Sequence, residues 1–569
     1  MARRLVPGFL SLAIPAALAA QQPAALPLKH ASKPTTAAIS ASDLMTRLYI
    51  FADDSMQGRE TGTAGHLKST AYIASELKRL GLQPAGDEGS YFQDVPMIRR
   101  AFDPASTITV DGTTLRGGAD FIATTRGPVP SLNGVSVVFG GTVGDTSSYP
   151  THDQIAGKIV VLKAAPGAGG RGGFGGPGGG RGAFAALRAL SDAVAIVTVT
   201  DALSSAAVQA ATHPREGDVM MKPTSNAPGG QLTITMTRAG AEALLGTSLD
   251  AATKGQVGKT VQANVGFRDD PAPARNVVAI MRGSDPKLRG EYIALGAHND
   301  HVGVGPQAVD HDSLHLYNAA RFAIRGMVSR GQQATPEQDA AVAAIRINYD
   351  SVHTARPARL DSIRNGADDD GSGSVTLLEL AEAFQKAPVK PKRSLVFVWH
   401  VGEEKGLLGS RWYSDHPTVP RDSIVAQLNM DMVGRGAATD LPVGSATYLQ
   451  LVGSRRLSTE LGDLVESVNK TEQMPFTFDY QFDANGHPEN IYCRSDHYNY
   501  ARYGIPVVFF TTGLHGDYHQ VTDEPQYIDY PHMARVGRFV LDLTRRVADL
   551  DHRPVVDKPK PDPNGTCRQ

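Results

Sequence analysis

Histidines and carboxylates stand at five separate places in this 569-residue chain, each just after an apolar, strand-like run or just ahead of a helical one. The five segments are 298–301, 366–373, 403–404, 431 and 518–519. In open α/β sheets, ligands bind beyond the carboxyl ends of the strands, so these segments are expected to meet at one sheet edge. One such segment is easily a coincidence, but five that converge predict a metal site.

The available donors are imidazoles and carboxylates, which suit zinc. The chain has only two cysteines, which excludes a four-thiolate zinc site, an all-thiolate iron–sulfur cluster and a disulfide-rich scaffold. Two histidines with three carboxylates are too many ligands for one tetrahedral zinc ion. They suit two Zn²⁺ per chain that share a bridging carboxylate and a bridging water, as in two-metal hydrolases.

Adjacent glutamates and a nearby aspartate extend the predicted site. Glu403 and Glu404 stand side by side, so in a loop one can bind metal while the other faces the water as a general base. Asp300 lies two residues after His298 and is expected to hold the free N–H of that imidazole.

Taken singly, each of these features has an ordinary structural interpretation. An acidic run such as 368–370 is usually a solvated turn or a helix N-cap, and a lone glutamate pair is usually on the surface. His301, His311 and His315 are interpreted as polar strand-end residues, because nothing in the sequence places them in the cluster. Only the shared sheet edge favours a site over these interpretations.

The elements that must position these residues show two kinds of pattern. Between about 102 and 267, short β-rich runs separated by turn residues predict a small, mostly-β module. From 275 onward, strands that are apolar throughout alternate with helical stretches, which predicts a largely parallel sheet with helices on both faces. The predicted fold class is therefore α/β, with a mostly parallel central sheet and a small β-rich insert.

The domain boundaries follow from the same patterns. The α/β domain is discontinuous, at 42–104 and 270–548, and the β-rich module fills 105–269. Within the module, 167–182 holds 11 glycines in 16 residues and is interpreted as a flexible surface loop. The segment 549–569 is rich in proline and charge, so it is predicted to be a disordered tail.

The N-terminus carries the features of an export signal. Residues 1–20 combine two arginines with an apolar run and a small-residue cleavage site, and 21–41 looks like a linker. No other window of about 18 apolar residues is present, so the mature protein is expected to be secreted or periplasmic, without stable membrane association. An uncleaved interfacial anchor is the alternative. Cys493 and Cys567 could pair after export, but Cys567 lies in the Pro-rich tail, so no structural disulfide is expected.

Composition and charge narrow the classes of partner. Hydrophobic residues make up 41% and charged residues 20%, which indicates a globular chain with a core. Lys plus Arg is 56 and Asp plus Glu is 58, for a formal net charge of −2. Without a strong positive excess, no nucleic-acid partner is expected.

The motifs around the five segments resemble peptidase family M28, a family of co-catalytic zinc peptidases. The likeness rests on GAHNDH at 296–301, NGADDDGSG at 365–373, EEKGLLGS at 403–410, NMDM at 429–432, SDH at 495–497 and YHQVTD at 518–523. It extends over about 42–104 and 270–545. It implies a zinc-exopeptidase-like fold and a peptide or protein substrate, and it leaves the oligomeric state open.

The resemblance also implies a role for each residue. The five implied zinc ligands are His298, Asp369, Glu404, Asp431 and His519. His298 and Glu404 would bind separate ions and Asp369 would bridge both. Asp431 would complete one site and His519 the other. Glu403 would be the general base and Asp300 the carboxylate behind His298. The family often has a cis peptide after the bridging aspartate, here Asp369–Asp370.

The β-rich insert and the insertion 306–360 have their own relation to the family pattern. The β-rich insert resembles a protease-associated (PA) domain, most clearly at 153–162. The insertion 306–360 replaces a connection that is usually short in the family, and it is predicted to be partly helical at 314–327 and 336–348. Because both flanking motifs hold ligands, it is expected to form a rim or lid that limits substrate size. A surface elaboration away from the cleft is the alternative.

The activity that the resemblance implies is exopeptidase hydrolysis, with an aminopeptidase favoured. A carboxypeptidase on the same fold would need a cation for the substrate's carboxylate, for which Arg435, Arg494 and Arg502 are candidates. Glutaminyl cyclases resemble the fold but use one zinc and lack the first histidine ligand, whereas His298 is present. A non-catalytic, receptor-like module is disfavoured because all five ligands and the base are retained.

Overall fold

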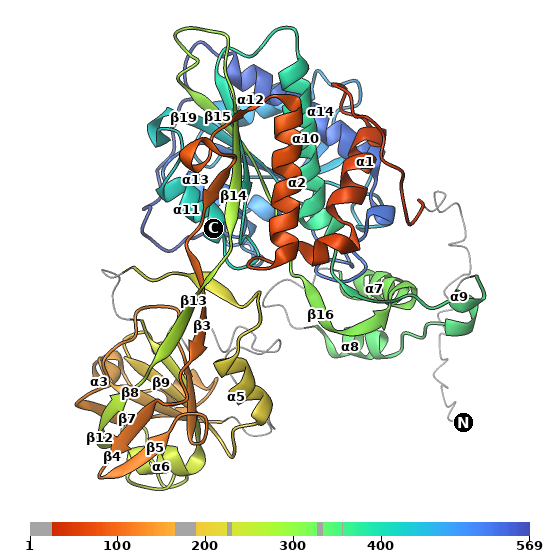
Figure 1. The fold of residues 1–569 in the computed structure, drawn as a ribbon. Coiled ribbons are helices and arrows are strands. Elements are labelled where there is room, and N and C mark those ends of the chain that lie inside the picture. The colour runs from red at the N-terminus through yellow and green to blue at the C-terminus, as the bar shows by residue number, and fades with distance from the viewer. Residues whose placement is uncertain (1–25, 165–188, 225–229, 327–333, 356) are drawn as a thin grey trace, which may run out of the picture.

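The computed structural model describes residues 26–164, 189–224, 230–326, 334–355 and 357–569. The predicted signal segment 1–20 and the Gly-rich segment 167–182 lie outside the described residues, as does the first part of the predicted linker. The described chain forms an α/β body and a separate β-rich lobe, joined by long strands (Figure 1).

A nine-stranded sheet forms the centre of the α/β body. Its strands lie in the order β1, β14, β18, β15, β19, β22, β20 and β21, and β2 also pairs with β14. Their bounds are β1 Gln83–Pro84, β2 Phe92–Asp94, β14 Arg275–Met281, β15 Tyr292–His298, β18 Ser394–His400, β19 Ile424–Met430, β20 Tyr448–Val452, β21 Thr477–Asp479 and β22 Val507–Thr511. The α/β class is confirmed. The four central strands β18, β15, β19 and β22 are parallel, whereas β14 and β20 pair antiparallel on either side, so the sheet is mixed with a parallel centre.

Helices cover both faces of this sheet, because every residue of β18, β19 and β22 is buried and an apolar strand needs cover on each side. One face packs against α1 Ala41–Phe51, α2 Ala64–Leu80, α10 Gly373–Lys386, α12 Thr459–Asn469 and α14 Tyr530–Ala548. The other face packs against α11 Leu408–Asp415 and α13 His497–Ala501. In Figure 1 the helices α1, α2 and α10 stand in front of the sheet.

A buried cation joins three of these helices. Arg47 of α1 donates to Glu379 of α10 at 2.5 Å and also to Glu382 of α10. The side chains of all three residues are at most 1% exposed. Arg47 also donates to Glu76 of α2 at 2.6 Å. Buried carboxylates without this guanidinium would be costly, so Arg47 fixes how α1, α2 and α10 pack.

The β-rich lobe has its own sheet and its own core. Its eight strands lie in the order β5, β4, β12, β7, β8, β9, β11 and β6. Their bounds are β4 Thr107–Val110, β5 Thr113–Arg116, β6 Phe121–Thr124, β7 Val135–Thr142, β8 Ile159–Lys163, β9 Ala195–Thr200, β11 Leu232–Thr237 and β12 Val257–Asn264, with helices α3 His152–Ile155, α5 Ser205–Thr212 and α6 Arg238–Leu245. A buried apolar cluster fills the lobe. The assignment of this lobe to the PA domains stays a prediction.

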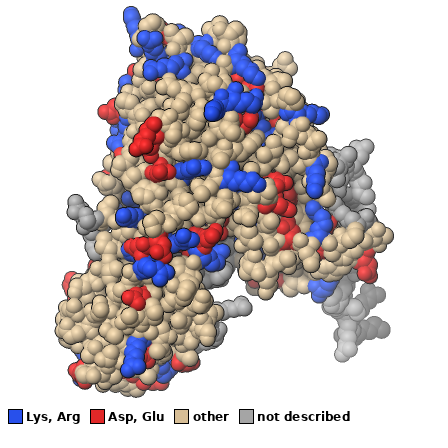
Figure 2. Space-filling view, in the orientation of Figure 1, with Lys and Arg blue, Asp and Glu red and all other residues tan. Residues whose placement is uncertain are grey.

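Three strands connect the lobe to the body: β3 Met97–Phe102, β10 Val219–Met221 and β13 Phe267–Ala272. Paired charges mark this junction, among them Arg100 and Asp269 at 2.7 Å. On the face drawn in Figure 2, acidic and basic side chains mingle here rather than forming a patch of one sign. Within the described residues, no helix has the length and apolar character needed to cross a bilayer.

The insertion 306–360 is held by a two-stranded sheet at its base. The antiparallel strands β16 Val304–Asp310 and β17 Leu360–Ile363 enclose three helices, α7 His311–Arg325, α8 Pro336–Ala343 and α9 Tyr349–Ala355. His311 directly follows β16 and begins α7, as a strand-end residue would, whereas His315 lies within α7, so its interpretation as a strand-end residue is wrong. Both rings stack on Tyr527, which draws the insertion toward the body.

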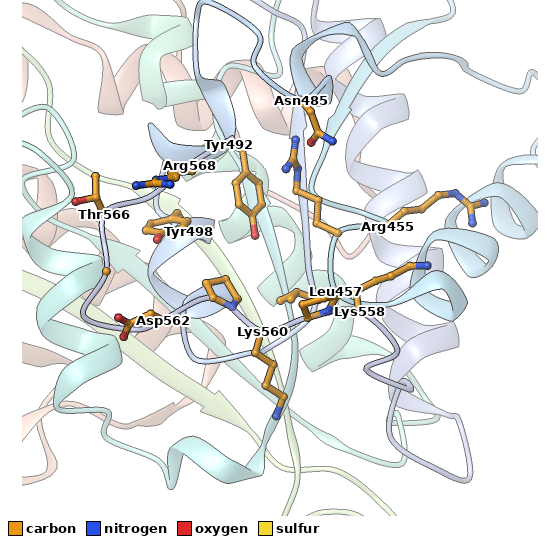
Figure 3. A pocket seen from close by; sticks show the side chains of 14 residues that line it. Arg455, Leu457, Asn485, Tyr492, Tyr498, Lys558, Lys560, Asp562, Thr566 and Arg568 are labelled. Atoms are coloured by element: carbon orange, nitrogen blue, oxygen red, sulfur yellow. The ribbon is translucent and has the colours of Figure 1, made fainter.

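The C-terminal segment corrects two expectations. Cys493 and Cys567 form a disulfide with Cα atoms 5.8 Å apart, although no structural bridge was expected. The predicted disordered tail 549–569 has no helix or strand, but it is held by this bond and by hydrogen bonds such as Val555 N–H to Glu460. Composition revealed the lack of regular structure, but it could not reveal contacts with residues far away in sequence. A cavity of about 530 Å³ lies beside this segment, lined by Arg455, Lys558, Lys560 and Arg568 among others (Figure 3).

Candidate metal centre

The structure brings the predicted site residues together at the carboxyl ends of the central strands. His298 ends β15, Asp431 follows β19 directly, and Glu403 and Glu404 come just after β18. His519 lies in the loop after β22. Asp369 lies in the turn that leads into α10. Parallel strands end at the same sheet edge, which explains how residues more than 200 positions apart meet.

The first group of donors surrounds His298. Its Nε2 atom is 3.1 Å from Asp369 Oδ1 and 3.6 Å from Asp431 Oδ1. Ser495 donates its hydroxyl to the other oxygen of Asp431 at 2.8 Å, which fixes that carboxylate. These three side chains can hold one cation.

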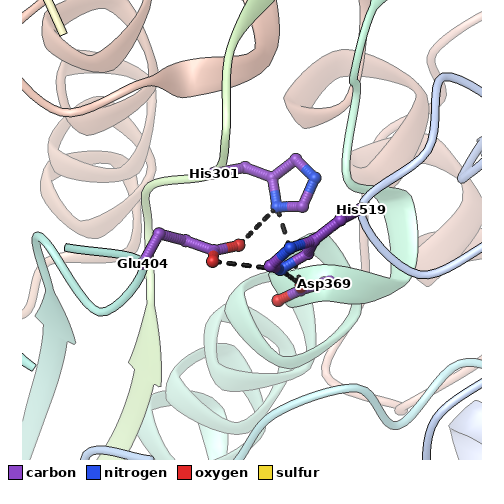
Figure 4. Close-up of side chains that lie close together, drawn as sticks. All are labelled: His301, Asp369, Glu404 and His519. Carbon is purple, nitrogen blue, oxygen red and sulfur yellow. Dashed lines mark ion pairs between the residues drawn. The ribbon is translucent and has the colours of Figure 1, made fainter. Parts of the chain in front are cut away.

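The second group surrounds His519 and includes a residue that sequence reasoning missed (Figure 4). His519 Nε2 lies 3.0 Å from Asp369 Oδ2 and 3.0 Å from Glu404 Oε2. His301 Nδ1 lies 2.9 Å from Glu404 Oε1, and its side chain is fully buried. The interpretation of His301 as a strand-end residue outside the cluster is therefore wrong. The chain turns after β15 and His301 N–H donates to Arg59 carbonyl, which a sequence pattern does not show.

Buried atoms of both groups lack ordinary partners. Within the described residues, no hydrogen bond reaches the following buried atoms: His298 Nε2, His301 Nδ1, Asp369 Oδ2, Glu404 Oε1 and His519 Nε2. Buried polar atoms are normally satisfied, so a convergent set of orphans is the signature of a cation site. Imidazole nitrogens and carboxylate oxygens form the donor set that suits zinc.

The three consecutive aspartates differ in what their oxygens do. Asp370 accepts N–H donors from His298 at 3.0 Å and Gly373 at 2.8 Å, so backbone groups occupy its carboxylate. Asp368 accepts the N–H of Gly434 at 2.7 Å. Asp369 instead turns one oxygen to each donor group, as a bridging ligand must. The predicted cis peptide between Asp369 and Asp370 is confirmed.

Asp300 lies close to His298 and also contacts the backbone of Glu403. The nearest acceptor for His298 Nδ1 is the Asp300 backbone oxygen at 3.0 Å, and the Asp300 carboxylate is 3.7 Å away. That carboxylate accepts the Glu403 N–H at 3.2 Å and the Thr61 hydroxyl at 2.8 Å. Asp300 therefore orients the loop that carries Glu403 as well as the imidazole.

Burial and neighbouring charges set the proton affinities of the site. Burial raises the pKa of Glu403 well above its usual range, and the charges of Asp431 and Glu404 raise it further while His298 opposes them. Burial lowers the pKa of His519, but Glu404 and Asp369 more than offset this and raise it to about 10. The carboxylates thus stabilise positive charge at the imidazoles, and Glu403 has a strong affinity for a proton.

Arg59, in the N-terminal segment, holds the turn that carries the three aspartates. Arg59 is fully buried and donates to the carbonyl oxygens of Asn365 at 2.5 Å and Gly366 at 2.9 Å. Gly366 has φ +54°, and a Cβ there would lie 2.5 Å from the His301 ring. Glycine at this position therefore leaves room for the imidazole.

An apolar pocket opens beside the donor groups. Asp369, Glu403 and Asp431 form its polar side, and its apolar side is Met432, Phe482, Ile491, Phe509 and Leu514. Arg494 also lines it and pairs with Glu489 at 2.9 Å. Two other arginines do not line this pocket in the described structure: Arg435 pairs with Asp440 and Asp517, and Arg502 pairs with Asp415.

Comparison with known proteins agrees with the motifs. The profile of Peptidase family M28 matches residues 335–544, which include four of the five implied ligands. The resemblance to Peptidase family M28 is confirmed.

Individual relatives cover only parts of this M28-like chain or share little sequence with it. It is 28% identical over 228 residues to leucine aminopeptidase 1 of Ajellomyces capsulatus, which covers 38% of this chain and 55% of that protein. It is 30% identical over 192 residues to leucine aminopeptidase 1 of Paracoccidioides brasiliensis, which covers 32% and 46%. The chain thus spans about half the length of the curated relatives it matches. BSAP, a zinc aminopeptidase from Bacillus subtilis, aligns over 92% of this chain and 99% of its own with 16% identity and a TM-score of 0.44.

Proposed function

We propose that this protein is a two-zinc aminopeptidase that releases N-terminal residues from peptides. The observation that carries the proposal is the pair of donor groups that share Asp369 beside Glu403 and an apolar pocket. His298 and Asp431 would hold one ion, and Glu404 and His519 would hold the other. The M28 resemblance and the names of the relatives support this reading.

The chain's own residues account for the proton transfers. When bound, the two ions would supply an acidified water and would polarise the scissile carbonyl. Glu403 lines the pocket beside Asp369 and Asp431, where its carboxylate would accept the proton of that water and then deliver it to the leaving amine. Asp300 keeps Glu403 in place through its backbone N–H.

The pocket supports a preference for apolar N-terminal residues. Phe482, Ile491 and Phe509 offer an apolar surface within the pocket that also contains the donor side of the site. An apolar side chain gains roughly 25 cal/mol per Å² that it buries there. The names of the curated relatives, leucine aminopeptidase, agree with such a preference.

The carboxypeptidase alternative depends on Arg494. It is the arginine, among the three considered, that lines the pocket, but Glu489 already pairs with it. The deciding experiment compares free and N-acetylated aminoacyl substrates, together with metal analysis. We expect cleavage of the free-amine form alone and two zinc ions per chain. Cleavage that requires a free C-terminal carboxylate would establish the alternative.

The proposed location is outside the cytoplasm, by way of the predicted signal 1–20. The Cys493–Cys567 disulfide supports it, because structural disulfides persist in oxidising compartments. Expression of the full chain followed by N-terminal sequencing of the exported protein tests this. Export without removal of 1–20 would support the uncleaved anchor.

The insertion 306–360 is proposed to be a rim that limits substrate size. Its helix α7 is attached to the loop that carries His519: His315 lies 3.1 Å from Asp517, and Asn318 donates to Thr522 at 3.1 Å. Deletion of 308–359 is expected to speed the cleavage of long peptides relative to dipeptides. An unchanged ratio would mean that the insertion is a surface elaboration.

A further inference from the structure

His301 has the geometry of the proposed ligands rather than that of a hydrogen-bonding neighbour. Its Nδ1 atom lies 2.9 Å from Glu404 Oε1 and 3.7 Å from Asp369 Oδ2. Despite the short distance, neither ring nitrogen makes a hydrogen bond within the described residues, as is also true of His519 Nε2. The ring nitrogen therefore aims between oxygens, which is where a cation would sit, and not at one of them.

The spacing of the donor atoms fits a single metal ion. Ligand atoms about 2.0–2.2 Å from a tetrahedral zinc ion lie about 3.3–3.6 Å from one another. Of the four contacts within the group formed by His301, Asp369, Glu404 and His519, three are slightly shorter than this, at 2.9, 3.0 and 3.0 Å, and one is slightly longer, at 3.7 Å.

We propose that His301 is a direct ligand of the ion held by Glu404 and His519, and that the two metal sites of this chain are therefore unequal. The proposal rests on the two-zinc function proposed above. Four protein side chains complete one site, whereas His298, Asp369 and Asp431 offer three to the other. A site with four protein ligands has no vacant tetrahedral position and would take the shared water only as a fifth ligand, whereas a site with three keeps a position open for water or substrate.

The open site lies where the substrate would enter. Asp431 and Asp369 line the apolar pocket together with Glu403. The His301 side, in contrast, is packed: Gly366 abuts the ring, and the backbone of His301 pairs with the segment that carries Arg59 and Glu60. The site with four protein ligands is thus expected to keep its ion the more tightly, and the open site to exchange its ion.

Metal retention tests the proposal without reference to activity. The variant His301→Gln is dialysed against zinc buffers of decreasing free zinc, and bound zinc per chain is measured. His519→Gln is the positive reference, and His152→Gln, the same change at an exposed histidine of the β-rich lobe, is the matched control. We expect wild type to lose its zinc in two steps, and His301→Gln to weaken the tighter step more than 100-fold. The loss of an outer-sphere partner costs only about 10–100-fold, so a smaller effect would overturn direct ligation.

A second variant, His301→Cys, gives a direct spectroscopic signature of metal ligation. It keeps the proposal testable if the glutamine variant does not fold. Both natural cysteines are in the disulfide, so the described protein contributes no free thiol. Cobalt-loaded His301→Cys is expected to show a near-ultraviolet thiolate-to-cobalt charge-transfer band that wild type lacks. A folded variant that loads cobalt without this band would refute the proposal.

Different results would contradict the two-zinc function and the ligation by His301. A wild-type protein that binds fewer than two metal ions or cleaves no peptide would contradict the proposed function. A wild type that loads two ions and cleaves peptides, with His301→Gln retaining both as tightly, would contradict only the assignment of His301.

Discussion

Replacing Glu403 by glutamine separates the general base from the metal ligands. Glu404 lies within 3.0 Å of His301 and His519, whereas Glu403 lines the pocket, and its backbone N–H is held by Asp300. Glutamine keeps the size of the side chain but removes the carboxylate oxygen that would accept the proton. We therefore expect zinc content and stability to be kept. We expect kcat to fall by about 10²–10⁴-fold, the usual contribution of a general base, or about 2.7–5.4 kcal/mol at 1.36 kcal/mol per tenfold.

The assay compares Glu403→Gln with Glu404→Gln, its neighbour in the chain. Bound zinc is measured by elemental analysis, and kcat with an aminoacyl chromogenic amide in excess zinc. We expect Glu404→Gln to lose zinc first and rate as a consequence, because it removes a donor to the second group. Full activity of Glu403→Gln would refute its role as the base. Loss of zinc by Glu403→Gln with retention by Glu404→Gln would show that the two roles are reversed.

Three further predictions concern the frame around the site. Arg47→Met leaves two buried glutamates of α10 without their cation and is expected to lower the free energy of unfolding by about 3–5 kcal/mol, measured by denaturant titration; a loss below about 1 kcal/mol would contradict this. Gly366→Ala places a Cβ 2.5 Å from the His301 ring at a positive φ, so zinc retention at limiting free zinc should fall; retention equal to wild type would show that the ring has room to move. The double change Cys493→Ser with Cys567→Ser removes the bond next to Ile491 and Arg494 of the pocket lining, so KM for apolar substrates should rise while bound zinc is kept; an unchanged KM would show that the lining keeps its shape without the bond.

The donor residues could be predicted because the physics behind them is local and general. A fully apolar run such as 394–400 must be a strand covered on both faces, and its carboxyl end must lie beside those of its parallel neighbours. Polar residues that follow such runs are then placed at one edge without any knowledge of the tertiary structure. This reasoning places His298, Glu404 and Asp431 together.

What could not be predicted depends on contacts between distant segments. The strands β14 and β20 pair antiparallel with their neighbours because of the path that the chain takes between strands. An apolar run in the sequence predicts a strand but not its direction. The disulfide joins residues separated by 74 positions, and only the docking of the tail brings them together. His301 points into the site because its backbone pairs with a segment some 240 positions earlier, around Glu60.

The turn after β15 supplies an imidazole to each donor group. His298 faces the group with Asp431, and His301, three residues later, faces the group with Glu404, while Asp369 lies between them. The geometry of this one turn therefore couples the two groups. Because metal binding and folding share their free energy, an ion in either group stabilises the turn that the other group needs. A change that disorders this turn is thus expected to weaken both groups directly, whereas a change at His519 weakens its own group directly and the other only through the loss of that ion.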